Sequence, residues 1–411
     1  MTGAIRTRLS VMMFLEYVIW GAWLPLLGVY LGKDYLGFTN TQSAWIFNAF
    51  AIASLTGMFF GGQLADRLFA QEKFLAASHL IGGLAMFGLA FVSDFWSFFG
   101  LMLLHCFFYV PTLSVTNAIS FANLKDAQED FGKVRLWGTI GWIAASWPLL
   151  FLPAGSTRLI FIISGAASFV LAAFCLTLPN TPPAKNEGSA FAPFEALKLL
   201  AIPSIAILFL VTFFDSLVHY GHFFWTGRFL VALGLKENWV PAVMSIGQVM
   251  EIVAMAVLGG FLKRLGWRTT MIIGIIGQAL RFGAYSVGTP DTLWLVIAIN
   301  VVHGFAYACF FATVYIFVDD NFPKDVRTSA QSLFNLNILG IAAFASNSLW
   351  GFLGDSGWFG SAEEFNYNKL FLVPLGVAIF AAMLLALFFH PPRAKDAAVV
   401  DEFGASPIST S

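Results

Sequence analysis

The chain has 411 residues, of which 58% are hydrophobic and 11% charged, and its formal net charge is -1. A soluble globular protein carries about a quarter charged residues, so this composition excludes an ordinary soluble protein and predicts one surrounded by lipid. The near-zero net charge gives no reason to expect nucleic acid as a partner. All three cysteines, Cys106, Cys175 and Cys309, fall inside apolar runs. We expect them to act as small hydrophobic side chains, without a disulfide framework or a metal site.

Apolar runs separated by charged or Pro/Gly-rich breaks predict twelve transmembrane helices. The runs cover residues 9–31, 42–65, 73–94, 96–121, 133–154, 157–178, 203–231, 239–262, 268–288, 291–318, 328–353 and 368–390. The first run has no small-residue cleavage site after it, so we expect a retained helix and not a signal peptide. The longest polar interruption separates six runs from six. The predicted fold is therefore all-α and integral to the membrane, with an N-terminal half (1–180), a cytoplasmic linker (181–200), a C-terminal half (201–390) and a cytoplasmic tail (391–411).

Lysine and arginine residues are distributed unevenly over the loops. If the N-terminus is cytoplasmic, fifteen of them fall in inside segments and four outside, namely Lys33, Arg158, Lys236 and Lys369. Positively charged loops stay on the cytoplasmic side. We therefore expect both termini in the cytoplasm.

Two loops repeat each other across the halves. Each combines glycine with a basic cluster, and the residues are Gly62, Asp66 and Arg67 after the second run, and Gly259, Lys263, Arg264, Gly266 and Arg268 after the eighth. Glycine lets helices approach closely, and the basic cluster holds the turn at the cytoplasmic surface. An ordinary positive-inside turn would explain either loop alone. The recurrence of this glycine and basic pattern at equivalent positions of the two halves resembles the loop signature of the major facilitator superfamily. That resemblance implies two parallel repeats around a cavity, with the loops as conformational switches.

One carboxylate, Glu251, lies at the midpoint of residues 240–262, which hold no other charged side chain. An ionised group at the centre of the hydrocarbon layer costs several kcal/mol unless it has a partner, so such acids usually mark a substrate or proton pathway. Gln248 lies one turn earlier on the same helix face. A protonated acid bonded to a neighbouring helix is the alternative.

Three more polar stripes at helical spacing add to this face: Arg135, Thr139 and Trp142; Asp215, His219 and His222; His303 and Tyr307. Together they predict a polar, aromatic-lined pocket rather than a channel for bare ions. Purely structural roles are the alternative. Arg135 could be an interfacial anchor, His222 could be a contact between helices, and the aromatic residues could serve packing alone.

Four strings, at residues 14–23, 109–120, 135–142 and 327–334, closely resemble the bacterial nucleoside:proton symporter family of the major facilitator superfamily. The most specific reads Arg-Leu-Trp-Gly-Thr-Ile-Gly-Trp, at residues 135–142. The resemblance extends along essentially the whole chain. It implies an alternating-access importer of nucleosides in a bacterial inner membrane.

The resemblance also implies roles for individual residues. The substrate contacts would be Arg135, Thr139, Trp142, His219, His222, Gln248, Glu251 and Tyr307. The family keeps an aspartate where this chain has Ala308, so the proton would have to be carried by another group. The candidates are Glu251, His219, His222 and His303, since the unperturbed histidine pKa lies near 6.5.

The expected function is secondary active import of nucleosides, with protons as the coupling ion, by a monomer in contact with lipid and without a cofactor. Alternatives are a proton-independent facilitator or a carrier of another polar solute such as a sugar. A membrane sensor would need a soluble signalling domain, which the short linker and tail do not provide. An intramembrane enzyme is not expected, because no nucleophile-elbow or zinc-protease string occurs.

Overall fold

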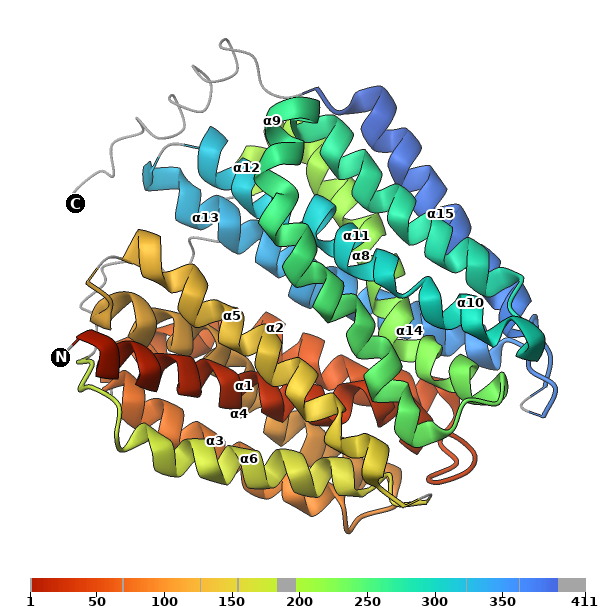
Figure 1. Ribbon diagram of the computed structural model, residues 1–411, viewed down its shortest axis with the longest axis horizontal. Helices are drawn as coiled ribbons and strands as arrows, with labels where there is room; N and C mark the ends of the chain where they lie inside the picture. The colour runs from red at the N-terminus through yellow and green to blue at the C-terminus, as the bar shows by residue number, and fades with distance from the viewer. Residues whose placement is uncertain are drawn as a thin grey trace.

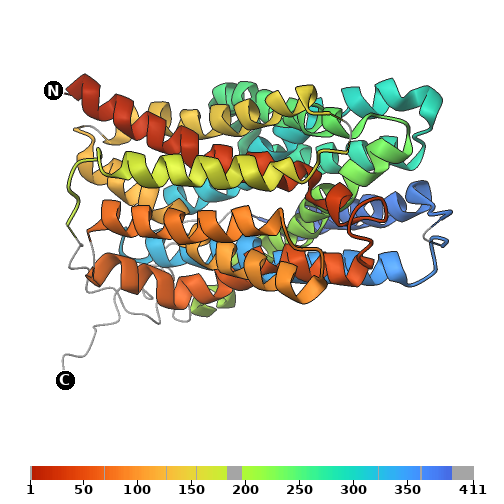
Figure 2. The ribbon, with the colours of Figure 1, turned by 90° about the horizontal axis from the view of Figure 1, so that it is seen from below.

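The computed structural model describes residues 2–68, 70–125, 127–153, 155–182, 197–322, 324–361 and 363–390. Within these ranges all regular elements are helical. The first group comprises α1 (Thr2–Leu31), α2 (Asn40–Leu68), α3 (Gln71–Leu89), α4 (Phe95–Asn123), α5 (Ala127–Ser146), η1 (Pro148–Phe151) and α6 (Leu159–Cys175). These helices lie side by side along the long axis (Figures 1 and 2).

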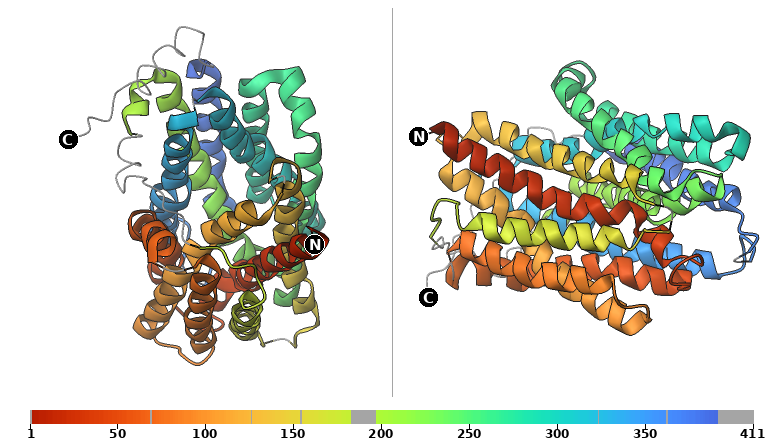
Figure 3. Two further views of the ribbon diagram at one scale, coloured as in Figure 1. Left: turned by 90° about the vertical axis from the view of Figure 1, so that its left-hand side faces the viewer. Right: turned by 60° about the horizontal axis from the view of Figure 1, so that its bottom comes forward.

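The second group lies against the first one, as the end-on view shows (Figure 3, left). It comprises η2 (Leu197–Ala201), α8 (Pro203–Ala232), η3 (Glu237–Trp239), α9 (Val240–Ser286), η4 (Pro290–Thr292), α10 (Leu293–Ala298), α11 (Val301–Tyr307), η5 (Ala308–Ala312), α12 (Thr313–Asn321), α13 (Lys324–Asn335), η6 (Leu336–Ile341), α14 (Ala342–Asp355) and α15 (Tyr367–Phe388). We call the end of the bundle that holds the N-terminus the terminal end, and the opposite end the distal end (Figure 1).

The helices follow the twelve apolar runs, with some runs joined and others subdivided. Runs eight and nine form the single element α9, which turns at Gly266, where φ is +72°. That value favours glycine, because a β-carbon would clash there. Seven described helices are long and apolar enough by themselves to cross a membrane. Of the predicted linker and tail, residues 183–196 and 391–411 lie outside the described residues.

Close helix crossings depend on glycine in each group. A Cβ on Gly141 would lie 2.2 Å from the Phe14 carbonyl oxygen, so α5 touches the backbone of α1. A Cβ on Gly304 would lie 2.2 Å from the Glu251 backbone nitrogen, so α11 touches α9 in the same way. These crossings bring the polar stripes of neighbouring helices into one wall.

Gly259 and Gly260, in the second repeated loop, do not lie at a close helix crossing in this structure. A Cβ on Gly259 or Gly260 would meet no atom within 4 Å. In this structure Gly259 therefore makes no close helix contact, since its side of α9 faces open space.

We predict that Gly141→Ala lowers the stability of the folded protein by about 1–3 kcal/mol, because the added methyl group overpacks the α1–α5 crossing. The matched control is Gly260→Ala, which is also helical but has open space around it. This control should be neutral or stabilising by up to about 1 kcal/mol, the helix-propensity gain. Apparent melting temperatures in detergent measure both. Equal melting temperatures for the two variants would contradict the close-crossing argument.

Candidate functional site

A cavity of about 890 Å³ lies between the two groups of helices. Its wall includes residues near the terminal end, such as Phe131 on α5 and Gln331 on α13, and residues deeper in the bundle, such as Trp23 on α1. The volume is within the range of small-molecule sites. Of the predicted substrate contacts, those that line it are Arg135, Thr139, Trp142, His219, Gln248, Glu251 and Tyr307.

Arg135 and its stripe form the wall in the first group. The Arg135 guanidinium lies over the Tyr17 ring, 4.2 Å from its centroid. Gly138 faces the same ring, and a Cβ there would lie 2.7 Å from Tyr17 Cδ2. The glycine of the Arg-Leu-Trp-Gly string therefore leaves room for Tyr17, and the ring in turn holds the guanidinium by a cation–π contact.

Aromatic rings continue this wall toward the distal end. Trp142 packs edge-on against Trp20 at 5.3 Å and reaches across to Phe223 of α8 at 6.4 Å. Trp20 is stacked on Phe50 at 5.0 Å. The cavity thus ends in an aromatic floor contributed by both groups, a surface suited to a flat ring.

Glu251 and Gln248 form the opposite wall. Gln248 is buried, and its Oε1 has no hydrogen-bond partner in the described structure. Glu251 interacts electrostatically with Arg135 across the cavity, but the described residues contain no ion pair between them. The two charged groups therefore face the same space without closing it. A ligand with several hydroxyl and amide groups would find donors on one side and acceptors on the other.

Histidines on α8 and α11 lie beside this wall. His219 lines the cavity and packs on His303 with ring centroids 5.4 Å apart. The structure does not bring His222 to the cavity. It is fully buried, accompanied by Thr226 at 2.8 Å and stacked on His303 at 4.7 Å. A spacing of three residues falls about 60° short of a full helical turn, which is enough to turn His222 away.

Arg281, on α9, is a buried cation that reasoning from the sequence left without a role. One guanidinium nitrogen donates to His303 Nδ1, and the other donates to Gln278 Oε1 at 2.6 Å. Because arginine only donates, His303 Nδ1 must carry a lone pair here. His303 is therefore held as a neutral ring with its proton on Nε2.

Glu16, on α1, anchors the first group away from the cavity. Its carboxylate oxygens meet Thr112 Oγ1 at 2.7 Å and His79 Nε2 at 2.8 Å, and all three side chains are buried. Tyr109 donates to the Glu16 carbonyl oxygen at 2.8 Å. Both carboxylate oxygens are thus satisfied, so this acid ties α1, α3 and α4 together.

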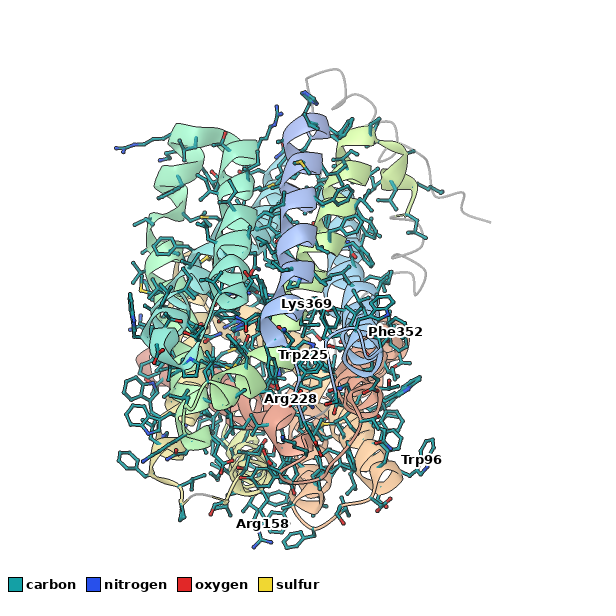
Figure 4. The ribbon with its side chains drawn as sticks, turned by 90° about the vertical axis from the view of Figure 1, so that its right-hand side faces the viewer. Trp96, Arg158, Trp225, Arg228, Phe352 and Lys369 are labelled. Atoms are coloured by element: carbon teal, nitrogen blue, oxygen red, sulfur yellow. The ribbon has the colours of Figure 1, made fainter. Side chains whose placement is uncertain are left out.

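Hydrogen bonds close the distal end between the two groups. Arg228 of α8 donates to the Gly28 carbonyl oxygen at 2.5 Å, to Asn40 Oδ1 at 2.7 Å and to Ser43 Oγ at 3.0 Å. Figure 4 shows Arg228 where the two groups meet, whereas Arg158 lies at the outer edge. Asp355 accepts from the backbone nitrogens of Asn40 and Thr41, at the start of α2. We call these contacts of Arg228 and Asp355 the distal latch.

A second part of this closure lies in the connecting loops. Tyr35 donates to Glu237 at 2.5 Å and accepts from Thr157 at 2.7 Å. The Gly155 nitrogen donates to the same Glu237 carboxylate at 2.9 Å. Burial and the neighbouring Glu237 raise the pKa of Tyr35 to about 12. Tyr35 therefore keeps its proton, and remains a donor, throughout the physiological pH range.

Several cavity residues were missed because their residue types are common in ordinary helices. They are Tyr17, Asn117, Tyr220, Gln331, Asn335 and Asn347. Asn117 and Gln331 lie inside two of the four family-like strings, and Asn335 directly follows the second of these. Those strings were therefore the signal in the sequence that could have identified them as cavity residues.

The predicted switch loops are described only in part. The side chains of Gly62, Asp66 and Arg67 lie outside the described residues. Lys263 and Arg264 are exposed at the end of the first part of α9, and Arg268 is half-buried just after the turn at Gly266. These positions fit a basic turn at the terminal end.

Comparisons with known proteins agree along the whole chain. Residues 3–394 match the family model described as Nucleoside H+ symporter. YegT of Escherichia coli (strain K12), whose name describes a nucleoside transporter, is 31% identical, and the match covers 93% of each chain. Xanthosine permease of the same strain is 28% identical, and the match covers 95% of this chain and 98% of its own.

A solved structure agrees as well. The crystal structure of a mutant of nucleoside transporter NupG matches 94% of this chain and 100% of its own, with a TM-score of 0.86 and 26% identity. The crystal structure of a D-xylose-proton symporter, at 14% identity and a TM-score of 0.72, shares the fold alone. This chain therefore belongs to the nucleoside H+ symporter family, and the predicted all-α major facilitator fold is confirmed.

Proposed function

We propose that this protein imports nucleosides together with protons across the bacterial inner membrane, with both termini in the cytoplasm. The observation that carries the proposal is the cavity of about 890 Å³, where charged and amide groups face each other above an aromatic floor. A nucleoside combines a flat base with ribose hydroxyls. It therefore matches both kinds of lining, and a sugar matches only one.

Within this proposal the base stacks on Trp142 or Tyr307, a contact that any base can make. Arg135 and Gln248 donate to the ligand, and Glu251 accepts from ribose hydroxyls. Selectivity comes from these polar groups, because a buried group left unpaired costs roughly 1–3 kcal/mol. His219, at the edge of the same wall, is a further contact, and His222 supports the wall from behind.

Transport follows if the two groups of helices rock about the cavity. With the terminal end in the cytoplasm, the cavity of this structure faces inward, and the distal latch closes the outer side. Opening outward requires the latch to break and the terminal end to close. The repeated loops, with Arg67 and Lys263 among their basic residues, lie at the end that must then come together.

We predict that Glu251→Gln abolishes uridine accumulation in proteoliposomes while leaving the melting temperature unchanged. The amide keeps the size of the side chain but loses the acceptor pair that binds ribose hydroxyls. Glu363→Gln is the matched control, because Glu363 is exposed in the loop before α15 and should transport normally.

Full uridine accumulation by the Glu251→Gln variant would overturn the assignment of this residue. A thermal-shift screen against nucleosides, nucleobases and sugars tests the substrate class separately. A shift with sugars alone would overturn the nucleoside proposal. Uptake that ignores an uncoupler and never exceeds equilibrium would favour a proton-independent facilitator.

We predict that Arg228→Ala favours the outward-open state, because it removes three hydrogen bonds between the groups. The readout is labelling of Asn347→Cys, a cavity residue, by an impermeant maleimide added from the distal side. The rate should rise about tenfold, since a net loss of about 1.4 kcal/mol shifts an equilibrium by that factor. Arg158→Ala, an exposed arginine at the same end, should leave the rate unchanged. An unchanged rate in the Arg228 variant would show that the latch does not hold this state.

A further inference from the structure

A second buried acid, Asp215 of α8, stands apart from the contacts described so far. Its side chain is fully buried, and neither carboxylate oxygen has a hydrogen-bond partner in the described structure. An ionised carboxylate in that situation costs several kcal/mol. By contrast, both carboxylate oxygens of Glu16 have hydrogen-bond partners. The arrangement around Asp215 therefore suits a neutral, protonated acid.

Two hydrogen-bond donors without a partner lie near the Asp215 carboxylate. Arg281 acts on the Asp215 carboxylate through its charge, and Gln278, also on α9, lies near enough to act on it as a donor, although their contact does not meet hydrogen-bond geometry. Arg281 Nε and Gln278 Nε2 are both buried and without a hydrogen-bond partner in the described structure. Buried donors and acceptors are normally paired. An acid and two donors that lie close together but unpaired indicate a second arrangement of the same groups, in which they are joined.

The two arrangements compete for Arg281. In this structure its guanidinium donates to His303 Nδ1 and to Gln278. An ionised Asp215 would be a stronger acceptor than a neutral imidazole, because charge-assisted hydrogen bonds are roughly twice as strong as neutral ones. Arg281 would then leave His303 for Asp215. The protonation state of the acid thus decides which partner the arginine holds.

His219 and His303 connect this pair to the cavity. His219 lies one helical turn after Asp215 on the same face of α8, and it lines the cavity wall. Its Nδ1 is buried and unpartnered. His303 also lines the cavity, on the wall that holds Glu251. A change at Asp215 therefore reaches the ligand space through one ring that can pass a proton and another that Arg281 orients.

We propose that Asp215 is the proton-coupling acid of this transporter and that Arg281 is the group it switches between Asp215 and His303. This inference rests on the proposed function as a nucleoside importer. At the position where the family keeps an aspartate, this chain has Ala308, which is fully buried in the π-helical turn η5. Asp215 supplies an acid from α8 instead.

The proton step balances simply. In the state seen here the Asp215 carboxyl holds the proton, and Arg281 holds His303 as a donor through Nε2–H. From this inward-facing state the carboxyl O–H bond breaks, and the proton passes by way of His219 to water in the cavity, which is open to the cytoplasm. The carboxylate then takes Arg281, and His303 loses its fixed orientation. The ligand is released with the proton, because one of its contacts has changed.

The charged groups around Asp215 are few. Arg281 is the charged residue that acts on it, and His219 and His222 follow on its own helix. His303 faces the same arginine from α11. The other helices packed on α8, such as α14 and α15, add no electrostatic interaction with Asp215 within the described structure. The switch is therefore between one acid and one cation.

The test uses proteoliposomes of the full chain that contain a pH-sensitive dye. Asp215→Asn fixes the neutral form, so uridine exchange should stay within about threefold of wild type, since the packing is conserved. Uridine-driven proton entry and uptake against a gradient should both fall to background. Asp94→Asn is the matched control: Asp94 caps α4 by accepting from the Ser97 nitrogen, and an asparagine oxygen accepts equally.

Each outcome decides the proposal. Proton entry by Asp215→Asn at the wild-type rate would overturn it. Loss of exchange together with proton entry in a folded variant would also overturn it, because the residue would then serve binding or structure. Wild-type protein that fails to exchange uridine would overturn the proposed function first, and this inference with it.

A second variant covers a failure to fold. Asp215→Asn leaves Arg281 without its acid, so the double variant with Arg281→Gln removes both charges at once. Exchange without proton entry in the double variant supports the switch. Asp215→Glu, which keeps an acid at this position, should retain proton entry, and a loss there together with normal exchange would contradict the proposal.

Discussion

The constraint that governs this structure is that polar groups inside the bundle must find their partners within the protein or in the cavity. The hydrocarbon around it offers no hydrogen bonds, and most buried polar side chains among the described residues are paired within the protein or face the cavity. Outward-facing positions are apolar or aromatic, as Trp96 and Phe352 illustrate in Figure 4. The chemistry of the protein is therefore concentrated between the helices. The position of every buried charge is informative for the same reason.

The two groups of helices satisfy this constraint differently. In the first group, Glu16 is fully bonded and Arg135 is held over a tyrosine ring, so charge and geometry are fixed. In the second group, Asp215 is unpaired and Arg281 divides its bonds between an amide and an imidazole. The first group thus holds its buried charges in fixed positions, and the second group contains a buried charge network that can rearrange. Coupling a proton to a substrate requires such an adjustable element, because a ligand shifts an equilibrium only between states that bind it differently.

Sequence reasoning succeeded where periodicity and hydropathy control the outcome. Spacing alone placed Arg135, Thr139 and Trp142 on one face, and the structure puts that face on the cavity. It could not identify the Arg281 network, because the partners come from α8, α9 and α11, and their contacts depend on glycines that carry no chemical signal. The buried position of His222 could not be predicted for a related reason: a helix face is broad, and a rotation of about 60° separates a side chain that lines the cavity from one buried behind it. Contacts between distant helices are beyond any pattern within one helix.

The energetics of rocking explain why the distal latch is polar. The bonds of Arg228 and Asp355 join the groups at an end close to water, where each hydrogen bond contributes only about 0.5–1.5 kcal/mol net, since water replaces it on opening. An apolar seal of the same area would expose its surface on opening and cost about 25 cal/mol per Å². A polar latch therefore keeps the two states close in free energy. Only then can the binding of one nucleoside, or the movement of one proton between Asp215 and water, determine which side is open.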